Sequence, residues 1–321
     1  MDLKQLKALV TIAEVGSVTK ASQLLHLVQP AVTRQIKLLE QELGVPLFER
    51  TREGMRPTEA GATFVERARR ALNELDRARA EIRPESGPVT GIATIGLLES
   101  TLDVLTEPLV ERVSRRHPGV RLRLLTAYSG HLQQWLDDGD VDLSLLYNLR
   151  STPSLHVQPL LREQLWAVGL PDSVLAADRP VSLADMIDRP MVMPGAGHGL
   201  RVLVDQACAR AKISPNISIE TNSMSLQKML VLAGHGWTIL PASGIAVDVA
   251  AGVFSAAPLT DPEATRDIVV GFQRAGRPSP AVEVVARELV HIVRSVVADG
   301  GWPSARIFDD SATPRARDTL R

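Results

Sequence analysis

The chain has 321 residues with 36 basic and 37 acidic side chains, which give a formal net charge of -1 at pH 7. This balance excludes nucleic-acid binding through overall positive charge, so any basic surface must be local. Cys208 is the only cysteine, so no internal disulfide can form and a reducing compartment is favoured. The N-terminus alternates charged and apolar residues, and no window approaches about 18 consecutive apolar residues. We therefore expect a cytoplasmic protein with no signal peptide and no membrane span.

The first segment, residues 1–57, has the pattern of three short helices followed by an extended hairpin. Gly16 ends the first apolar run, Ser17 offers an N-cap for the second, and Pro30 suits the first turn of the third. Gly44 ends the third run, and Gly54 interrupts the extended stretch that follows. The three apolar runs are Leu6, Leu9, Val10, Ala13; Val18, Ala21, Leu24, Leu25; and Val32, Ile36, Leu39, Leu43. We predict a helix-turn-helix with a β-wing.

The third predicted helix directs polar and basic residues away from its apolar stripe. In a helix-turn-helix the second helix of the motif enters the major groove, where Gln can pair with adenine and Arg with guanine. We predict base contacts from Gln29, Pro30, Ala31, Thr33 and Arg34, and phosphate contacts from Lys37, Arg50, Arg52 and Arg56. The helical pattern alone leaves open a solvated basic face on an ordinary three-helix unit.

Residues 58–88 form the second segment, which is predicted to be a long helix and a hinge. Small or apolar residues recur every three or four positions from Gly61 to Ile82, which is typical of a coiled-coil seam. A lone helix would leave this seam uncovered, so we predict a dimer through it. The seam residues are Phe64, Ala68, Ala71, Leu75, Ala78 and Ile82. The alternative is a helix that folds back on its own domain.

Residues 89–302 alternate between strand and helix patterns, which indicates an α/β domain with a largely parallel sheet. The pattern restarts after residue 162, so we predict two lobes, residues 89–162 with 268–300 and residues 163–267, with a ligand cleft between them. In the second half we expect strands near 165–170, 190–193, 217–221, 238–240 and 268–272, and helices at 200–211, 225–233 and 280–298. The tail, residues 303–321, is polar and aperiodic and is predicted to be disordered.

The first segment resembles the N-terminal winged helix-turn-helix of LysR-type transcriptional regulators. The resemblance lies in Ala21 with Leu24-Leu25, in "QPAVTRQI" and "LEQELGVPLFER", and in "PTEAG", which opens the linker helix. The order and length of the remaining segments also agree with this family. The resemblance implies a long linker helix and a two-lobed α/β effector domain similar to periplasmic binding proteins. The implied partners are double-stranded promoter DNA, a small-molecule effector, further copies of the chain in a homodimer or homotetramer, and RNA polymerase.

One position departs from the family pattern. The family commonly has Ser or Thr before "QP", and this chain has Val28. The change removes a possible N-cap of the recognition helix, worth about 0.5–2 kcal/mol. It puts in doubt only the DNA contact that the resemblance implies at position 28.

By position, the resemblance places the ligand-contacting loops at five points of the effector domain. The candidate effector-binding residues are Ser100, Thr101, Ser129, Tyr147, Asn148, His198, Asn222 and Ser223. Hydroxyl and N–H groups at helix N-termini favour an anion, so a small carboxylate is the expected ligand class. Glu99 counts against an anionic ligand, because a carboxylate in the cleft would repel an anion. The alternative is that these residues only cap helices.

No motif for metal or cofactor chemistry is present. The seven histidines are scattered, and the glycine-rich stretches match neither GxGxxG, a P-loop nor a GxSxG elbow. We therefore expect no metal, no cofactor and no enzymatic activity. Two alternatives stay open: a regulator with a vestigial pocket that is controlled by abundance alone, and a two-lobed solute-binding protein or enzyme whose first segment only mediates oligomerisation.

Overall fold

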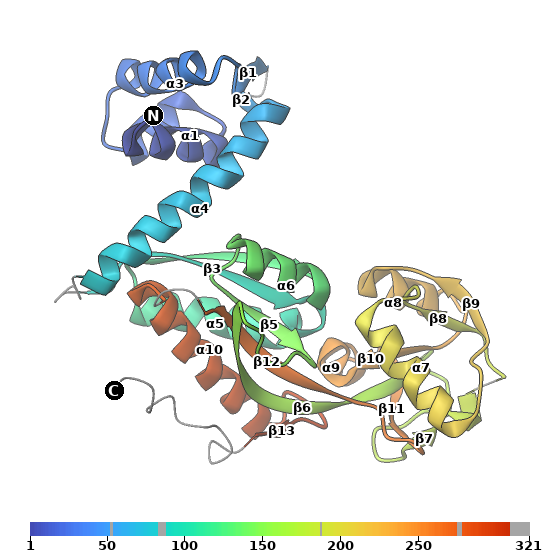
Figure 1. The fold of residues 1–321 in the computed structure, drawn as a ribbon. Helices are drawn as coiled ribbons and strands as arrows, with labels where there is room; N and C mark the ends of the chain where they lie inside the picture. The colour runs from blue at the N-terminus through green and yellow to red at the C-terminus, as the bar shows by residue number, and fades with distance from the viewer. Residues whose placement is uncertain (52–53, 83–87, 187, 275–277, 309–321) are drawn as a thin grey trace. The chain divides into compact units, whose positions relative to one another are not determined.

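The computed structural model describes residues 1–51, 54–82, 88–186, 188–274 and 278–308. The chain divides into two compact units, Met1–Ser86 and Gly87–Arg321. Figure 1 labels the helices and strands of both units. No helix within the described ranges combines the length and apolar character needed to cross a membrane.

The first unit is a three-helix bundle with a two-stranded wing and a long C-terminal helix (Figure 1). Its elements are α1 (Leu3–Val15), α2 (Val18–Leu24), α3 (Gln29–Leu43), β1 (Phe48–Thr51), β2 (Gly54–Pro57) and α4 (Glu59–Ile82). The predicted apolar stripes meet in one core, where Leu9, Ile12 and Leu39 are fully buried. The predicted winged helix-turn-helix is therefore confirmed.

Local signals set the helix ends and attach the wing. Ser17 caps α2 by accepting a hydrogen bond from the Lys20 N–H, and Gly16 ends α1 in the left-handed region with φ 64°. The Met55 N–H donates to the Gly16 carbonyl at 2.8 Å, which joins the wing to the end of α1. A Cβ at position 54 would lie 2.4 Å from that same carbonyl oxygen, so only glycine fits there.

The first turns of α4 pack against the core of the first unit. Val65 and Ala68 are 6% and 3% exposed and belong to the core cluster, with Phe64 partly buried against it. This corrects the predicted seam at Ala68, because the chain's own core already covers that side chain. Leu75 is 42% exposed, whereas the side chain of Ile82 lies outside the described residues. The predicted seam thus begins as a core helix and becomes an uncovered stripe further along.

The second unit begins with a lobe built on a mixed sheet. Strand order in this lobe is β4-β3-β5-β12-β6. Its elements are β3 (Gly91–Leu98), α5 (Leu102–Arg116), β4 (Val120–Ala127), α6 (Ser129–Asp138), β5 (Leu143–Tyr147), the first part of β6 (Leu155–Gly169), β12 (Thr265–Gln273), α10 (Pro280–Ala298) and β13 (Arg306–Ile307). α5 packs on α10, and α6 packs on β5. The core of this lobe includes Leu105, Leu136, Leu145 and Leu289.

The second lobe is built around the end of β6, which pairs with β10 and β11. Its elements are β7 (Val181–Ser182), β8 (Met191–Met193), α7 (Gly199–Ala211), β9 (Ile217–Glu220), α8 (Met224–Leu232), β10 (Thr238–Pro241), α9 (Ala246–Ala250) and β11 (Ser255–Thr260). Its core includes Leu165, Val204 and Ile239. The elements predicted for the second half of the chain are present, with ends shifted by a few residues except at β6.

The sheet is not largely parallel, which corrects the prediction. β3 runs parallel to β4 and β5, but β12 is antiparallel to both β5 and β6. The reason is that the chain leaves the first lobe along β6 and returns along β12, and these two strands lie side by side in opposite directions. β6 also begins at Leu155, ten residues before the predicted strand, and passes continuously through the predicted lobe boundary at residue 162.

Residues 303–308, after α10, are ordered, so the prediction of a disordered tail is wrong for them. β13 pairs antiparallel with β6, and Trp302 is 2% exposed with its indole N–H donating to Glu163 at 2.9 Å. The Trp166 indole N–H donates to the Ser304 hydroxyl at 3.0 Å. Backbone pairing and one buried tryptophan need no apolar periodicity, which is why the sequence pattern did not predict them. Residues 309–321 lie outside the described residues.

Trp302→Ala should destabilise the second unit by about 3–5 kcal/mol, because it removes a fully buried indole. Trp302→Phe keeps most of the packing and should cost about 1–3 kcal/mol, because Glu163 loses one donor. All four tryptophans lie in the second unit, so urea unfolding followed by tryptophan fluorescence reports on it. Equal stability of the wild type and the alanine variant would contradict the ordered C-terminal segment.

Candidate DNA-binding surface and ligand cavity

The exposed face of α3 carries the residues predicted to contact bases. Gln29, Pro30 and Arg34 are exposed, and Ala31 and Thr33 are half-buried. They lie on one side of a helix whose other side, with Val32, Ile36 and Leu39, builds the core. A shallow hollow runs along this face and is lined by Gln29, Pro30, Thr33, Arg34, Lys37, Leu38 and Gln41. The structure therefore gathers Lys37 with Gln29, Pro30, Thr33 and Arg34, whereas Ala31 does not line the hollow.

The N-terminus of α3 has no side-chain cap. Val28 occupies the N-cap position with 69% of its surface exposed and makes no capping hydrogen bond. The Ala31 and Val32 N–H groups instead donate to the Val28 carbonyl at 3.0 and 3.3 Å, and Pro30 has no N–H to satisfy. The start of the helix is thus left with few unpaired N–H groups despite the missing hydroxyl.

The wing arginines lie on opposite faces of the hairpin. Arg50 pairs across the hairpin with Met55, and Arg56 pairs with Glu49. Directly opposed residues share a face and neighbouring residues alternate, so Arg50 and Arg56 point in opposite directions. Arg52 lies outside the described residues. The two described wing arginines are therefore separate contacts rather than one basic cluster.

A cavity lies between the two lobes of the second unit, at the carboxyl ends of β3, β4 and β5. It contains about 450 Å³ of space not filled by protein atoms, part of it open to solvent. Both lobes contribute to its wall. The lining residues are Leu98, Glu99, Ser100, Ala127, Tyr128, Ser129, Tyr147, Pro194, His198, Leu200, Thr221, Asn222, Met224, Gln227, Leu240, Pro241 and Arg266.

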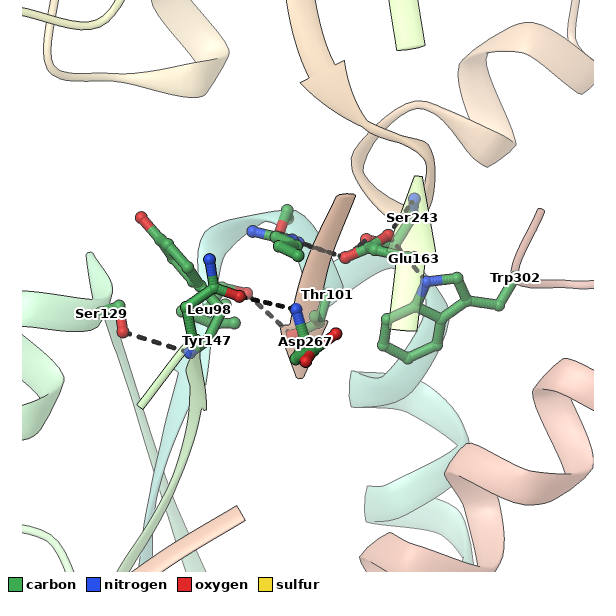
Figure 2. A network of polar contacts seen from close by, with 11 residues as sticks. Leu98, Thr101, Ser129, Tyr147, Glu163, Ser243, Asp267 and Trp302 are labelled. Atoms are coloured by element: carbon green, nitrogen blue, oxygen red, sulfur yellow. Dashed lines mark hydrogen bonds and ion pairs between the residues drawn. The ribbon is translucent and has the colours of Figure 1, made fainter. Parts of the chain in front are cut away.

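Five of the eight predicted effector-binding residues line this cavity, and three do not. The five are Ser100, Ser129, Tyr147, His198 and Asn222. Thr101 is fully buried and donates its hydroxyl to the Leu98 carbonyl at 2.9 Å (Figure 2). Asn148 accepts the Asp267 N–H at 2.7 Å, and Ser223 caps α8 by accepting the Leu226 N–H at 3.3 Å. Bonds to backbone groups thus hold these last three side chains, but only Ser223 caps a helix, as the capping alternative predicted.

The wall of the cavity contains a buried ion pair that the sequence analysis missed. Arg266 on β12 and Glu163 on β6 are directly opposed and are 3% and 0% exposed. The Arg266 Nε donates to Glu163 at 2.7 Å. Glu163 also accepts hydrogen bonds from Ser243 and from the Trp302 indole (Figure 2). Both charged residues are visible in the sequence, but each has a charged neighbour, Arg162 or Asp267, so their pairing needed the strand register.

Arg266 connects this pair to the cavity. Its Nη2 donates to the Ser100 hydroxyl at 2.6 Å, and its guanidinium lies 5.1 Å from the centre of the Tyr147 ring. Burial raises the pKa of Tyr147, and the nearby Arg266 partly offsets this rise. Ser129 accepts the Tyr147 N–H at 3.3 Å, as Figure 2 shows, which leaves the Ser129 hydroxyl proton available to a ligand.

Glu99 and His198 complete the polar part of the wall. The Glu99 carboxylate accepts from the Met224 N–H at 3.3 Å and from the Ser225 hydroxyl at 3.1 Å, so this first-lobe residue caps α8 of the second lobe. His198 caps α7, where its Nδ1 accepts the Leu200 N–H at 3.2 Å. Burial, followed by the nearby Arg266, lowers the pKa of His198, which favours the neutral ring.

Two family models match this chain. The model described as the bacterial regulatory helix-turn-helix protein of the lysR family matches residues 3–62, and the LysR substrate binding domain matches residues 86–293. The chain belongs to the LysR family of bacterial transcriptional regulators. It is therefore a DNA-binding regulator that joins a winged helix-turn-helix to an effector-binding domain.

Curated relatives and solved structures agree with membership of the LysR family. The chain is 28% identical to the HTH-type transcriptional regulator BbuR of Bordetella bronchiseptica, over 94% of this chain and 93% of that protein. It is 32% identical to the uncharacterized HTH-type transcriptional regulator YwqM of Bacillus subtilis, over 78% of this chain and 86% of the relative. A full-length OxyR variant from Pseudomonas aeruginosa shares the fold with a TM-score of 0.65 at 22% identity, covering 92% of this chain and 95% of that one.

Arg266→Met in this LysR-family regulator should destabilise the second unit by about 3–5 kcal/mol, because Glu163 becomes a buried charge without its cation. The double variant Arg266→Met with Glu163→Gln removes both charges and should recover part of that loss. Fluorescence-detected urea unfolding of the two single variants and the double variant forms a double-mutant cycle. If the losses of stability in the two single variants add up in the double variant, Glu163 and Arg266 do not interact directly.

Proposed function

We propose that this LysR-family regulator binds promoter DNA as a dimer through α3 and the wing, and that a small molecule in the lobe cavity sets its activity. The exposed face of α3 carries this proposal, because polar and basic side chains gather there on a helix whose opposite face builds the core. The proposal includes a cytoplasmic location and no enzymatic activity. RNA polymerase is the further partner that such a regulator would contact at a promoter.

Base recognition is assigned to the first two turns of α3. Gln29 and Arg34 have the hydrogen-bonding groups that discriminate adenine and guanine, and Ala31 and Thr33 offer methyl groups to thymine. Lys37, Arg50 and Arg56 are exposed and suit phosphate contacts. Val28 is an exposed apolar side chain beside them, which suits a contact with a thymine methyl or sugar better than a phosphate hydrogen bond.

Dimerisation is assigned to the outer part of α4. Ala71, Leu75 and Ala78 are exposed along one stripe of the helix beyond the part that packs on the core. Leu75, at 42% exposure, is the large apolar residue of this stripe, and a second copy of α4 would cover it. Two such dimers could associate into the homotetramer that the resemblance implies.

A carboxylate-bearing effector is the ligand class that the cavity supports. The Ser129 hydroxyl, the Arg266 guanidinium and the His198 ring are hydrogen-bond donors on its wall. These groups favour the ligand-responsive regulator over one with a vestigial pocket. Binding between lobes connected by β6 and β12 would change the angle between them, and an oligomer could transmit that angle to the spacing of its DNA-binding heads.

Arg34→Ala should weaken binding to the DNA upstream of the regulator's own gene by about 1–3 kcal/mol and should reduce the preference over unrelated DNA. Lys37→Ala should weaken both specific and unrelated binding and lower the salt dependence. Fluorescence anisotropy at several salt concentrations measures both effects. Lys7→Ala on α1 is the matched control, because it removes one exposed positive charge outside α3. Unchanged affinity and preference in Arg34→Ala would exclude α3 as the recognition helix.

Leu75→Glu should convert the dimer into a monomer at micromolar concentration, because it inserts like charges into the α4 seam. Ala62→Glu places the same side chain on an exposed position of α4 off the seam and should leave the dimer intact. Sedimentation velocity of the two variants measures the change. A Leu75→Glu variant that remains dimeric would place the interface elsewhere.

A further inference from the structure

The polar groups around the cavity include several hydrogen-bond donors and one carboxylate. Arg266, His198 and Ser129 are donors, and Glu99 is the one carboxylate among the described lining residues. Ser100 connects Glu99 with Arg266, because it follows Glu99 in the chain and its hydroxyl accepts from Arg266 at 2.6 Å. Glu99 and the donors are therefore within reach of one small molecule.

The tautomer of His198 makes its second ring nitrogen a donor. Its Nδ1 accepts the Leu200 N–H, so in the neutral ring the proton sits on Nε2. This Nε2 is buried and has no hydrogen-bond partner among the described residues. The ring lies edge-on to Tyr128, with 4.5 Å between ring centroids, and is close enough to Arg266 and Glu99 for both charges to affect its pKa. A buried N–H without a partner is costly, and an acceptor atom of a ligand would satisfy it.

Arg266 also retains donor capacity. Its Nε and Nη2 bond Glu163 and Ser100, whereas the described residues provide no hydrogen bond to its Nη1. The Arg266 side chain lines the cavity, so Nη1 is a donor that a ligand could use.

The charges around the cavity then indicate which kind of ligand can supply the acceptor atoms. Glu163 already neutralises Arg266 inside the wall, so the net charge at the cavity is that of Glu99. A simple carboxylate would add a second negative charge near Glu99 with no cation to offset it. Glu99 accepts three long hydrogen bonds from Met224 and Ser225 and, with about four acceptor sites, can accept one more.

We infer that the cavity takes a small zwitterion of the α-amino acid class. Its carboxylate lies toward Arg266, His198 and Ser129, and its ammonium group lies toward Glu99. The apolar part of the wall, with Leu98, Met224 and Leu240, accommodates a short apolar side chain. This inference rests on the proposed function of the cavity as an effector site, and it narrows the ligand from carboxylates in general to those that also carry a cation.

Titration calorimetry on the full-length protein tests the inference with matched probes. Each common apolar L-α-amino acid is compared with its analogue lacking the amine and its analogue lacking the carboxylate, for example L-valine, 3-methylbutanoate and isobutylamine. At least one amino acid should bind ten times more tightly than both of its analogues.

Glu99→Gln should weaken amino-acid binding at least tenfold and leave binding of the matched carboxylate unchanged or stronger. Ser129→Ala should weaken the amino acid and the carboxylate alike, because it acts at the other end of the ligand. Glu111→Gln on α5 is the control, because Glu111 is exposed at 65% and does not line the cavity.

Two outcomes separate the inference from the proposed function. Simple carboxylates that bind the wild type as tightly as amino acids, with the same affinity in Glu99→Gln, would overturn the zwitterion and leave the effector site standing. Silence from every probe, together with a DNA footprint that none of them changes, would overturn both.

Discussion

The ion pair between Glu163 and Arg266 lies where the chain crosses between the two lobes of the effector-binding domain. β6, which contains Glu163, runs from the first lobe into the second, and β12, which contains Arg266, runs back. The two residues are directly opposed, so their ion pair joins the two crossing strands. Ser100 of the first lobe and Ser243 of the second bond the same pair. Losing one partner of such a buried pair is strongly destabilising. The intact pair therefore holds the crossing strands and the wall of the cavity in one arrangement.

This arrangement gives the ligand cavity its asymmetry. Glu163 neutralises Arg266, which still offers a hydrogen-bond donor to the cavity. Glu99 of the first lobe bonds the N-terminus of α8 in the second lobe. The lobes are therefore joined at the crossing strands by an internal ion pair and at the N-terminus of α8 by the Glu99 carboxylate. A ligand that competes for Glu99 and engages Arg266 acts on both connections between the lobes, which is the physical route from binding to a changed lobe angle.

Much of the fold was predictable because its signals are local. Helical stripes, Gly16, Ser17 and Gly44 specify the winged helix-turn-helix, and strand–helix alternation specifies the α/β lobes. What failed depends on pairing between distant segments. Three features show no periodic pattern in the sequence. They are the antiparallel direction of β12, the burial of Ala68 by the chain's own core and the docking of residues 303–308 on β6. At the cavity, the resemblance to LysR-type regulators identified Ser100 and Ser129 by position. Arg266 and Glu163 needed strand register, and Thr101 and Asn148 bond backbone groups instead of lining the cavity.

The most direct test of the account is the distance between the two lobes, measured by pulsed electron paramagnetic resonance. Spin labels are attached at Glu111→Cys on the first lobe and Val174→Cys on the second, both exposed positions, in a Cys208→Ala background. Dilution with unlabelled chain restricts the signal to distances within one molecule. The account predicts one narrow distance distribution with Arg266 present and a broad one in Arg266→Met. An equally narrow distribution in the variant would contradict the role of the ion pair in fixing the lobes.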